Sequence, residues 1–375
     1  MAGESGSPRQ TDEETVLLRP NRTIRSRAAR ALFGACAFAS AVLAAPVVAQ
    51  QPAPAALEGD FADPFVIPFA GRYYAYSTNM VEQRLNVPVA FSTDLRTWNM
   101  VADSTHRSGL RDAMPELPAW SERGATWAPE VMQIGDRYVL YYTARHRRRG
   151  QQCVGAAVSA DPRGPFVPQG DEPLVCQHDL GGTIDASPFR DADGQLYLYY
   201  KNDGNHPSAQ TATQLWGQRL AADGLSLVGE PVSLARNDVG WEAHVIEAPF
   251  MVRRPSGTYI LFFSANDFAW QDRQPLSEYA SGYASCTGPL GPCTDAPENP
   301  ILASRRDPDC LSGPGHPMVF QAEGQEYIAF HGWATRRGCR RMANARFMYI
   351  AALSWNGDVP VIGGTIAAPP SGRDQ

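Results

Sequence analysis

The sequence predicts an all-β fold, a five-bladed β-propeller, from three observations. A hairpin signature recurs five times, and its turn glycines are 64, 59, 63 and 67 residues apart. Each repeat consists of short runs of aromatic and β-branched residues bounded by glycine, aspartate and proline. No stretch after the N-terminal region has a convincing apolar period of 3.6 residues. Four strands in each of five repeats make a propeller, and a β-sandwich or a solenoid is the structural alternative.

The strands are expected at matching places in successive repeats. The strands that follow the turn glycines include residues 138–142, 196–200 and 259–263. Third strands are expected at residues 154–159 and 282–285, and each is followed by a Gly-Pro turn. The repeat is longer than that of common propeller families, so long loops must connect the strands. They are expected at residues 100–124, 202–214 and 264–281.

Residues 1–49 are predicted to be a secretory signal peptide. Arginines cluster between residues 22 and 30, an apolar run occupies residues 31–48, and Val-Val-Ala at its end fits a small-residue cleavage site. A membrane anchor is the alternative, but the run contains Pro46 and is barely long enough to span a bilayer. We therefore expect residues 50–375 to form a single secreted domain, extracellular or periplasmic, without a membrane contact.

The charge of that domain excludes one class of partner. Removing residues 1–49 takes six arginines and four acidic residues from the 33 basic and 39 acidic residues of the chain. This leaves 27 basic and 35 acidic residues and a net charge of −8. Such an acidic balance argues against a nucleic-acid partner. Lysine occurs once, at Lys201, while arginine is abundant, which is more typical of genomic base composition than of function.

Six cysteines lie beyond residue 49, an even number that is typical of disulfides in an oxidising compartment. Six cysteines allow fifteen pairings. Proximity in sequence favours three local pairs, each inside one repeat. These pairs are Cys153–Cys176, Cys286–Cys293 and Cys310–Cys339. The spacings typical of structural zinc sites are absent from the sequence.

An acidic residue or a histidine, with a proline close by, stands at the start of each repeat. The five residues are Asp63, Glu130, Asp185, Glu247 and His316. Residues at equivalent positions of successive blades converge on one mouth of a propeller's central channel. Several carboxylates around one cavity repel one another and lose hydration, so that arrangement is costly unless function requires it.

Carboxylates flanking a cleft are what hydrolysis of a glycosidic bond requires. One carboxyl must be protonated to assist the leaving oxygen, and another must be ionised. A third carboxylate nearby raises the pKa of the acid, because neighbouring negative charges resist coexisting. Asp63, Asp185 and Glu247 are therefore the candidate catalytic residues.

On these residues the chain resembles glycoside hydrolase family 43, five-bladed propeller enzymes that act on arabinans, xylans and related furanosides. The resemblance covers residues 58 to about 362. It implies that Asp63 is the general base, Asp185 the modulator of the acid's pKa, and Glu247 the general acid of an inverting mechanism. Further matching segments are residues 92–98, 127–130, 313–316 and 346–355.

The resemblance also suggests residues around the reacting bond. Substrate-binding residues are expected to be Trp127, Glu130, His331 and Arg346. Trp127 would stack on a sugar ring, as Trp98, Trp241 and Trp333 would if they are not in the core. His331 would donate to a sugar hydroxyl, and Glu130 has a structural role at the blade start as its alternative.

His316 resembles a histidine that many family members place near the axis, sometimes on calcium through water. We expect no required cofactor and consider a structural Ca²⁺ at His316. Glu242 and Asp179 replace the chosen acids if the register is wrong.

The implied activity is that of an α-L-arabinofuranosidase, an arabinanase or a β-xylosidase, acting as a monomer on plant or microbial poly- or oligosaccharides. A galactofuranosidase, a retaining fructan-cleaving enzyme and a non-catalytic sugar-binding propeller are the alternatives. The fructan enzymes open with Asn-Asp-Pro-Asn-Gly, whereas this chain has Ala-Asp-Pro-Phe at residues 62–65. A binding protein is disfavoured because none of the three carboxylates is lost.

Overall fold

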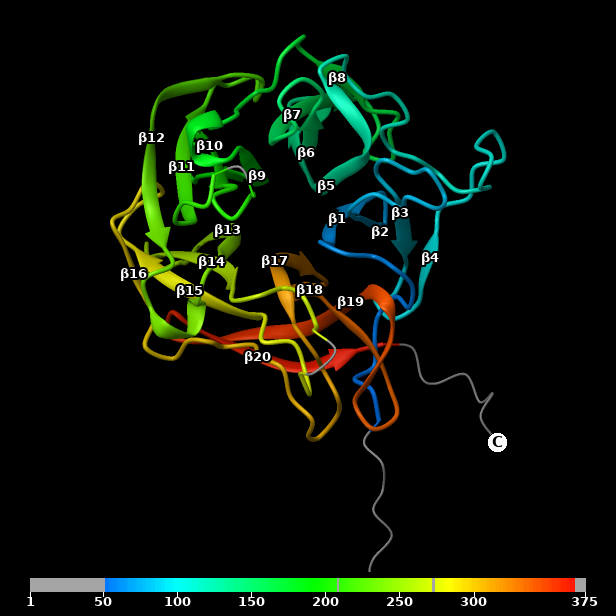
Figure 1. Ribbon diagram of the computed structural model, residues 1–375, viewed down its shortest axis with the longest axis vertical. Helices are drawn as coiled ribbons and strands as arrows, with labels where there is room; N and C mark the ends of the chain where they lie inside the picture. Colours follow the sequence, from blue (N-terminus) through cyan, green and yellow to red (C-terminus); the bar gives the residue numbers. More distant parts are fainter. Residues whose placement is uncertain (1–50, 208, 272–273, 368–375) are drawn as a thin grey trace, which may run out of the picture. The chain divides into compact units, whose positions relative to one another are not determined.

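The computed structural model describes residues 51–207, 209–271 and 274–367. These residues form five four-stranded antiparallel sheets arranged as blades around an axis (Figure 1). Each blade is a meander in which consecutive strands pair. The all-β five-bladed propeller predicted from the repeat is therefore confirmed.

Within the described residues the helices are two 3₁₀ turns, η1 (His178–Leu180) and η2 (Gly240–Glu242). None of them is long and apolar enough to cross a membrane. The predicted signal peptide lies outside the described residues.

The strands of the first two blades are β1 (Phe65–Phe69), β2 (Arg72–Tyr76), β3 (Val89–Ser92), β4 (Trp98–Met100), β5 (Ser121–Ile134), β6 (Arg137–His146), β7 (Gln152–Ser159) and β8 (Val167–Gln169). Those of the third and fourth blades are β9 (Thr183–Arg190), β10 (Leu196–Asn202), β11 (Gln214–Leu220), β12 (Leu227–Arg236), β13 (Ile246–Arg253), β14 (Tyr259–Ala265), β15 (Ala280–Cys286) and β16 (Cys293–Asp295). The fifth blade contains β17 (Gly315–Ala322), β18 (Gln325–Arg336), β19 (Arg340–Asn356) and β20 (Val359–Ile366).

The second strand of each blade holds the core together on both of its faces. Successive side chains of a strand point to opposite faces of the sheet. In β6 the fully buried Tyr142 packs in the cluster shared with the first blade, whereas Tyr141 packs in the cluster shared with the third. In β14 Phe263 faces the third blade and Phe262 the fifth. In the second and fourth blades a doublet of aromatic residues therefore packs against both neighbouring blades.

Each innermost strand has, within it or just ahead of it, a residue in the left-handed region of backbone conformation. These residues are Asp63, Ala128, Asp185, Ala248 and His316, with φ between 45° and 57°. In β5, β9, β13 and β17 the register with the second strand shifts at this point, which is a β-bulge. Only three of the five acidic or histidine residues noted in the sequence are equivalent by this criterion. Glu247 precedes the left-handed residue of its blade by one position, and Glu130 follows its own by two.

The backbone N–H of each left-handed residue donates to a side chain of the preceding blade. Ala128 donates to Thr78 Oγ1 (3.0 Å), Asp185 to Thr143 Oγ1 (3.2 Å) and Ala248 to Asp185 Oδ2 (3.0 Å). His316 donates to Ser264 Oγ (2.8 Å), and Asp63 donates to His331 Nδ1 (3.2 Å). Together the five bonds form a closed ring of hydrogen bonds around the axis, which we call the inter-blade ring. It satisfies donors that the bulges remove from the strand ladders.

The chain ahead of β1 runs along the fifth blade and closes the propeller. Ala56 and Leu57 donate to the carbonyl of Met348 in β19, and Phe61 donates to that of Arg346. The segment then enters the first blade. The first and fifth blades are thus tied by backbone hydrogen bonds in addition to the ring.

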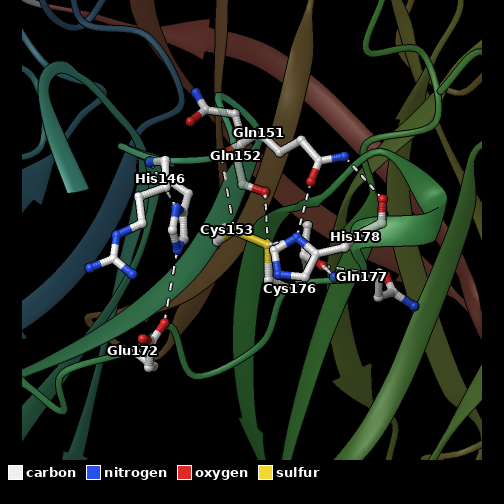
Figure 2. The surroundings of a disulfide bond; sticks show 10 residues. His146, Gln151, Gln152, Cys153, Glu172, Cys176, Gln177 and His178 are labelled. Carbon is white, nitrogen blue, oxygen red and sulfur yellow. Dashed lines mark hydrogen bonds and ion pairs between the residues drawn. A yellow bond between two sulfur atoms is a disulfide. The ribbon is translucent and has the colours of Figure 1, made fainter. Parts of the chain in front are cut away.

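All three disulfides predicted from sequence proximity are present. They join Cys153 to Cys176, Cys286 to Cys293, and Cys310 to Cys339. Figure 2 shows the first of these pairs, with His178 Nδ1 3.5 Å from Cys176 Sγ. The second joins β15 to β16 at the outer edge of the fourth blade. Each disulfide staples a loop or an outer strand to the blade that carries it.

The three disulfides should contribute unequally to stability. Their sequence separations are 23, 7 and 29 residues, and the entropy that a crosslink removes from the unfolded chain rises with loop length. We expect a Cys310→Ser/Cys339→Ser variant to lose about 1 kcal/mol more unfolding free energy than Cys286→Ser/Cys293→Ser. Urea unfolding of both double variants measures the difference, and an equal or reversed order would contradict the expectation.

Candidate active site

A pocket of about 400 Å³ opens where the starts of the inner strands converge. Asp63, Asp185 and Glu247 all line it. Each of the three is 9% exposed, so their carboxyl groups are largely removed from water yet reachable from the pocket. The three residues come from three different blades, the first, the third and the fourth.

Asp63 is held in its ionised form. Its Oδ1 lies 3.2 Å from Nη1 of Arg346 and 3.0 Å from Nδ1 of His331, and Thr78 Oγ1 donates to Oδ2. Burial alone would raise the pKa of Asp63, but neighbouring charge, chiefly that of the Arg346 guanidinium, outweighs it. The pKa of Asp63 therefore lies well below its usual range. The pKa of His331 itself falls to about 4, mainly through burial and the charge of Arg346, so that imidazole is neutral at pH 7.

Both carboxyl oxygens of Glu247 accept a hydrogen bond. Lys201 Nζ donates to Oε2 at 2.9 Å, and the hydroxyl of Tyr279 donates to Oε1 at 2.7 Å. The Tyr279 ring reaches this place because residue 315 is glycine: a Cβ there would lie 1.8 Å from the ring carbon Cε1. Burial would raise the pKa of Glu247, but the charge and hydrogen bond of Lys201 lower it below its usual value.

Asp185 is the one of the three catalytic candidates whose pKa is raised. Burial, and then the negative charge of Glu247, raise the pKa of Asp185 well above its usual range, although the Ala248 N–H donates to its Oδ2. Two carboxyl groups that interact this strongly titrate as a pair. Of this pair Asp185 therefore has the higher pKa, because Lys201 stabilises the charge on Glu247.

Two of the four expected substrate-binding residues line the pocket. Trp127 is 36% exposed at its wall, and Arg346 reaches into it while holding Asp63. His331 is 1% exposed and lies beneath Asp63 rather than at the wall. Glu130 is also buried outside the lining, where burial raises its pKa well above the usual range and Ser187 hydrogen-bonds to it.

Glu242 and Asp179 are remote from this pocket. Glu242 Oε2 accepts the N–H groups of Asp238 and Val239 and so closes the turn η2, and Asp179 belongs to the turn η1. Of the other tryptophans, Trp98, Trp241 and Trp333 do not line the pocket.

The surroundings of His316 offer little for calcium. Its Nδ1 lies 3.6 Å from Asp63 Oδ1. Among the described residues, neither of the groups of three potential metal ligands contains His316. Calcium prefers six to eight oxygen ligands, so His316 and Asp63 alone do not make a calcium site. A structural Ca²⁺ stays a prediction, and no step below uses it.

Among the pocket residues that sequence reasoning did not select are Lys201, Asp203, Asn205, Tyr279 and Phe268. Lys201 had a signal, because it is the single lysine of the chain and stands at the end of a strand of aromatic residues. Tyr279 and Phe268 come from the long loop between β14 and β15, whose path toward the pocket has no signature in the sequence.

Several known proteins resemble this chain in both fold and sequence. A solved structure described as a thermostable family-43 glycoside hydrolase superposes with a TM-score of 0.70 and 28% identity, covering 83% of this chain and 95% of that one. A β-D-galactofuranosidase of Aspergillus niger is 28% identical over 292 residues, 73% of this chain and 74% of the relative. An extracellular endo-α-(1→5)-L-arabinanase of Thermotoga petrophila is 29% identical over 161 residues, 37% of this chain and 33% of the relative. The family description glycosyl hydrolases family 43 matches residues 54–360, nearly all of the propeller. The chain belongs to that family and is a glycoside hydrolase.

Proposed function

We propose that this enzyme hydrolyses glycosidic bonds of arabinose- or xylose-containing poly- and oligosaccharides with inversion of anomeric configuration. The observation that carries the proposal is the convergence of Asp63, Asp185 and Glu247 on one pocket, with opposite electrostatic surroundings. The Arg346 guanidinium keeps the Asp63 carboxylate ionised. The other two carboxyl groups, Asp185 and Glu247, share a proton. These are the two protonation states that glycoside hydrolysis needs.

Asp63 acts as the general base. Its carboxylate takes a proton from a water molecule whose oxygen forms the new bond to the anomeric carbon. Glu247 gives its proton to the glycosidic oxygen as the bond between that oxygen and the anomeric carbon breaks. In this step the proton of the Asp185–Glu247 pair resides on Glu247, and afterwards the pair regains a proton from solvent.

The sugar specificity is proposed from the relatives. Arabinanase, xylosidase and galactofuranosidase activities are named among them, and two of these sugars are five-membered furanose rings. A galactofuranoside is the second candidate substrate, because the Aspergillus niger relative aligns over 292 residues. Exposed Trp127 and Phe268 at the pocket wall offer apolar faces for a sugar ring.

We further propose that the mature enzyme is secreted. Three disulfides are typical of proteins that fold in an oxidising compartment, and the arabinanase relative is described as extracellular.

Activity should be found on p-nitrophenyl α-L-arabinofuranoside, β-D-xyloside or β-D-galactofuranoside, and on arabinan or xylooligosaccharides. Glu247→Gln keeps the shape of the side chain but has no proton to give. We expect it to lower kcat on the natural glycoside by about 10²–10⁴-fold, and less on the aryl glycoside, whose leaving group needs little protonation. A wild-type rate in Glu247→Gln would reject Glu247 as the acid. Thermal melting of both proteins controls for folding.

The first product released should have the anomeric configuration opposite to that of the substrate. If Asp63 activates water instead of attacking carbon, only one displacement occurs at the anomeric centre. Proton NMR of the early reaction, before mutarotation, distinguishes the two anomers. A retained configuration would mean that Asp63 is a nucleophile.

Replacement of Asp185 should shift the upper pH limit of activity downward. The alkaline limb reports the loss of the last proton of the Asp185–Glu247 pair. In Asp185→Asn that proton is held by Glu247 alone, without a second carboxylate to raise its pKa, so the limb moves to lower pH and kcat falls. A pH–rate profile of kcat tests this. An unchanged profile would mean that Asp185 does not affect the ionisation of Glu247 and serves only to accept the N–H of Ala248.

A further inference from the structure

Lys201 occupies a position that holds a hydrogen-bond acceptor in each of the four other blades. Thr143, Ser264 and His331 each pair with the residue just before the left-handed residue of their own blade. Thr78 does so through its N–H to the carbonyl of Ala62. In the third blade the residue that pairs in this way, with Ile184, is Lys201.

At four of these positions the side chain accepts the inter-blade N–H of the next blade. A lysine ammonium has three donors and no acceptor, so Lys201 cannot do the same. The inter-blade ring is completed in the third blade by Asp185, whose Oδ2 accepts the N–H of Ala248. Because the third blade has a lysine where the other blades have an acceptor, Asp185 accepts the hydrogen bond of the inter-blade ring. Lys201 is then free to donate to Glu247.

The surroundings of Lys201 fix its ammonium in place. Its side chain is 0% exposed. Nζ donates to Glu247 Oε2 at 2.9 Å and to Asn205 Oδ1 at 2.7 Å, and it lies 3.9 Å from Asp203 Oδ1. Burial would lower the pKa of Lys201, but the carboxylates of Glu247, Asp203 and Asp185 raise it, so the ammonium stays charged. A buried charge with such partners does not move freely.

We propose that Lys201 is a positioning residue for Glu247, which holds the carboxyl group toward the scissile bond and sets the upper pH limit of activity. This inference rests on the proposed role of Glu247 as the acid. Lys201 balances the repulsion between Glu247 and Asp185, and together with Tyr279 it leaves the Glu247 carboxyl one orientation. A charged side chain in that place also makes Glu247 a stronger acid toward the leaving oxygen.

Several ionisable groups surround Glu247, and each enters the expected pH dependence. They are Lys201 from β10, Asp185 from β9, Asp63 ahead of β1, Tyr279 ahead of β15, Asp203 after β10 and His316 from β17. Lys201 is the one cation among the groups that donate to Glu247 in the described part of the chain. Its removal should therefore shift the ionisation of Glu247 more than any other neutralising change in this set.

The test compares Lys201→Met, Lys201→Arg and wild type on the natural oligosaccharide that the wild type cleaves, because its leaving oxygen needs a proton from Glu247. Lys201→Met keeps length and removes the charge. We expect kcat to fall about tenfold to 100-fold through loss of positioning, and the alkaline limb to move to higher pH because Glu247 holds its proton more tightly. Lys201→Arg should restore the position of the limb. An alkaline limb that stays in place in Lys201→Met would overturn the proposal.

Arg346→Met is the matched control, because it removes the cation beside Asp63 instead. Its acidic limb should move to higher pH while its alkaline limb stays. If Lys201→Met has too little activity, the carboxyl carbon of Glu247 is followed by ¹³C NMR against pH, and Glu247→Gln identifies its signal. That titration must move to higher pH in Lys201→Met. Failure of the proposed function is distinguishable, since Glu247→Gln would then remain active whatever Lys201→Met does.

Discussion

Each inner strand of this propeller has a left-handed residue within it or just ahead of it, and the hydrogen bond from that residue's N–H to the preceding blade closes the inter-blade ring. A non-glycine residue there costs on the order of 1–3 kcal/mol, so the surrounding contacts must hold it. Aspartate and histidine tolerate the conformation better than most residues, and they occupy three of the five positions. The same bulge turns the adjoining side chains toward the axis. Backbone geometry that closes the ring therefore also forms the pocket.

The pocket is a balance between crowded carboxylates and two cations. Arg346 donates to Asp63, and Lys201 donates to Glu247. Asp185 accepts only a backbone N–H and interacts with the charge of Lys201 from a distance. The difference decides which carboxyl group carries the proton. Asp63 and Asp185 stand at equivalent positions, and their pKa values are shifted in opposite directions because only Asp63 is hydrogen-bonded to a cation.

Much of the fold follows from the sequence because its signals are local. Turn glycines and short strands repeat five times, aromatic doublets stand in four of the five second strands, and nearby cysteines pair within a blade. The three carboxylates were found for the same reason, since each stands within three residues of a proline near the start of a strand. The register was less accessible. Ala128 and Ala248 hold the left-handed positions in two blades, and nothing in an alanine marks it. The sequence predicted Glu247 as the acid, but it did not show that Glu130, expected to bind substrate, is buried outside the pocket. Lys201 and Tyr279 were missed because their roles depend on contacts between blades.

The outer surface of this enzyme is built without lysine. The one lysine of the 375 residues is Lys201, and its side chain is sealed inside the pocket wall. All positive charge on the exterior therefore comes from arginine, whose guanidinium does not react with succinimidyl esters or aldehydes under conditions that modify amines. Coupling the folded enzyme to a support through side-chain amines has no accessible target, so immobilisation has to use the α-amino group or the abundant surface carboxylates.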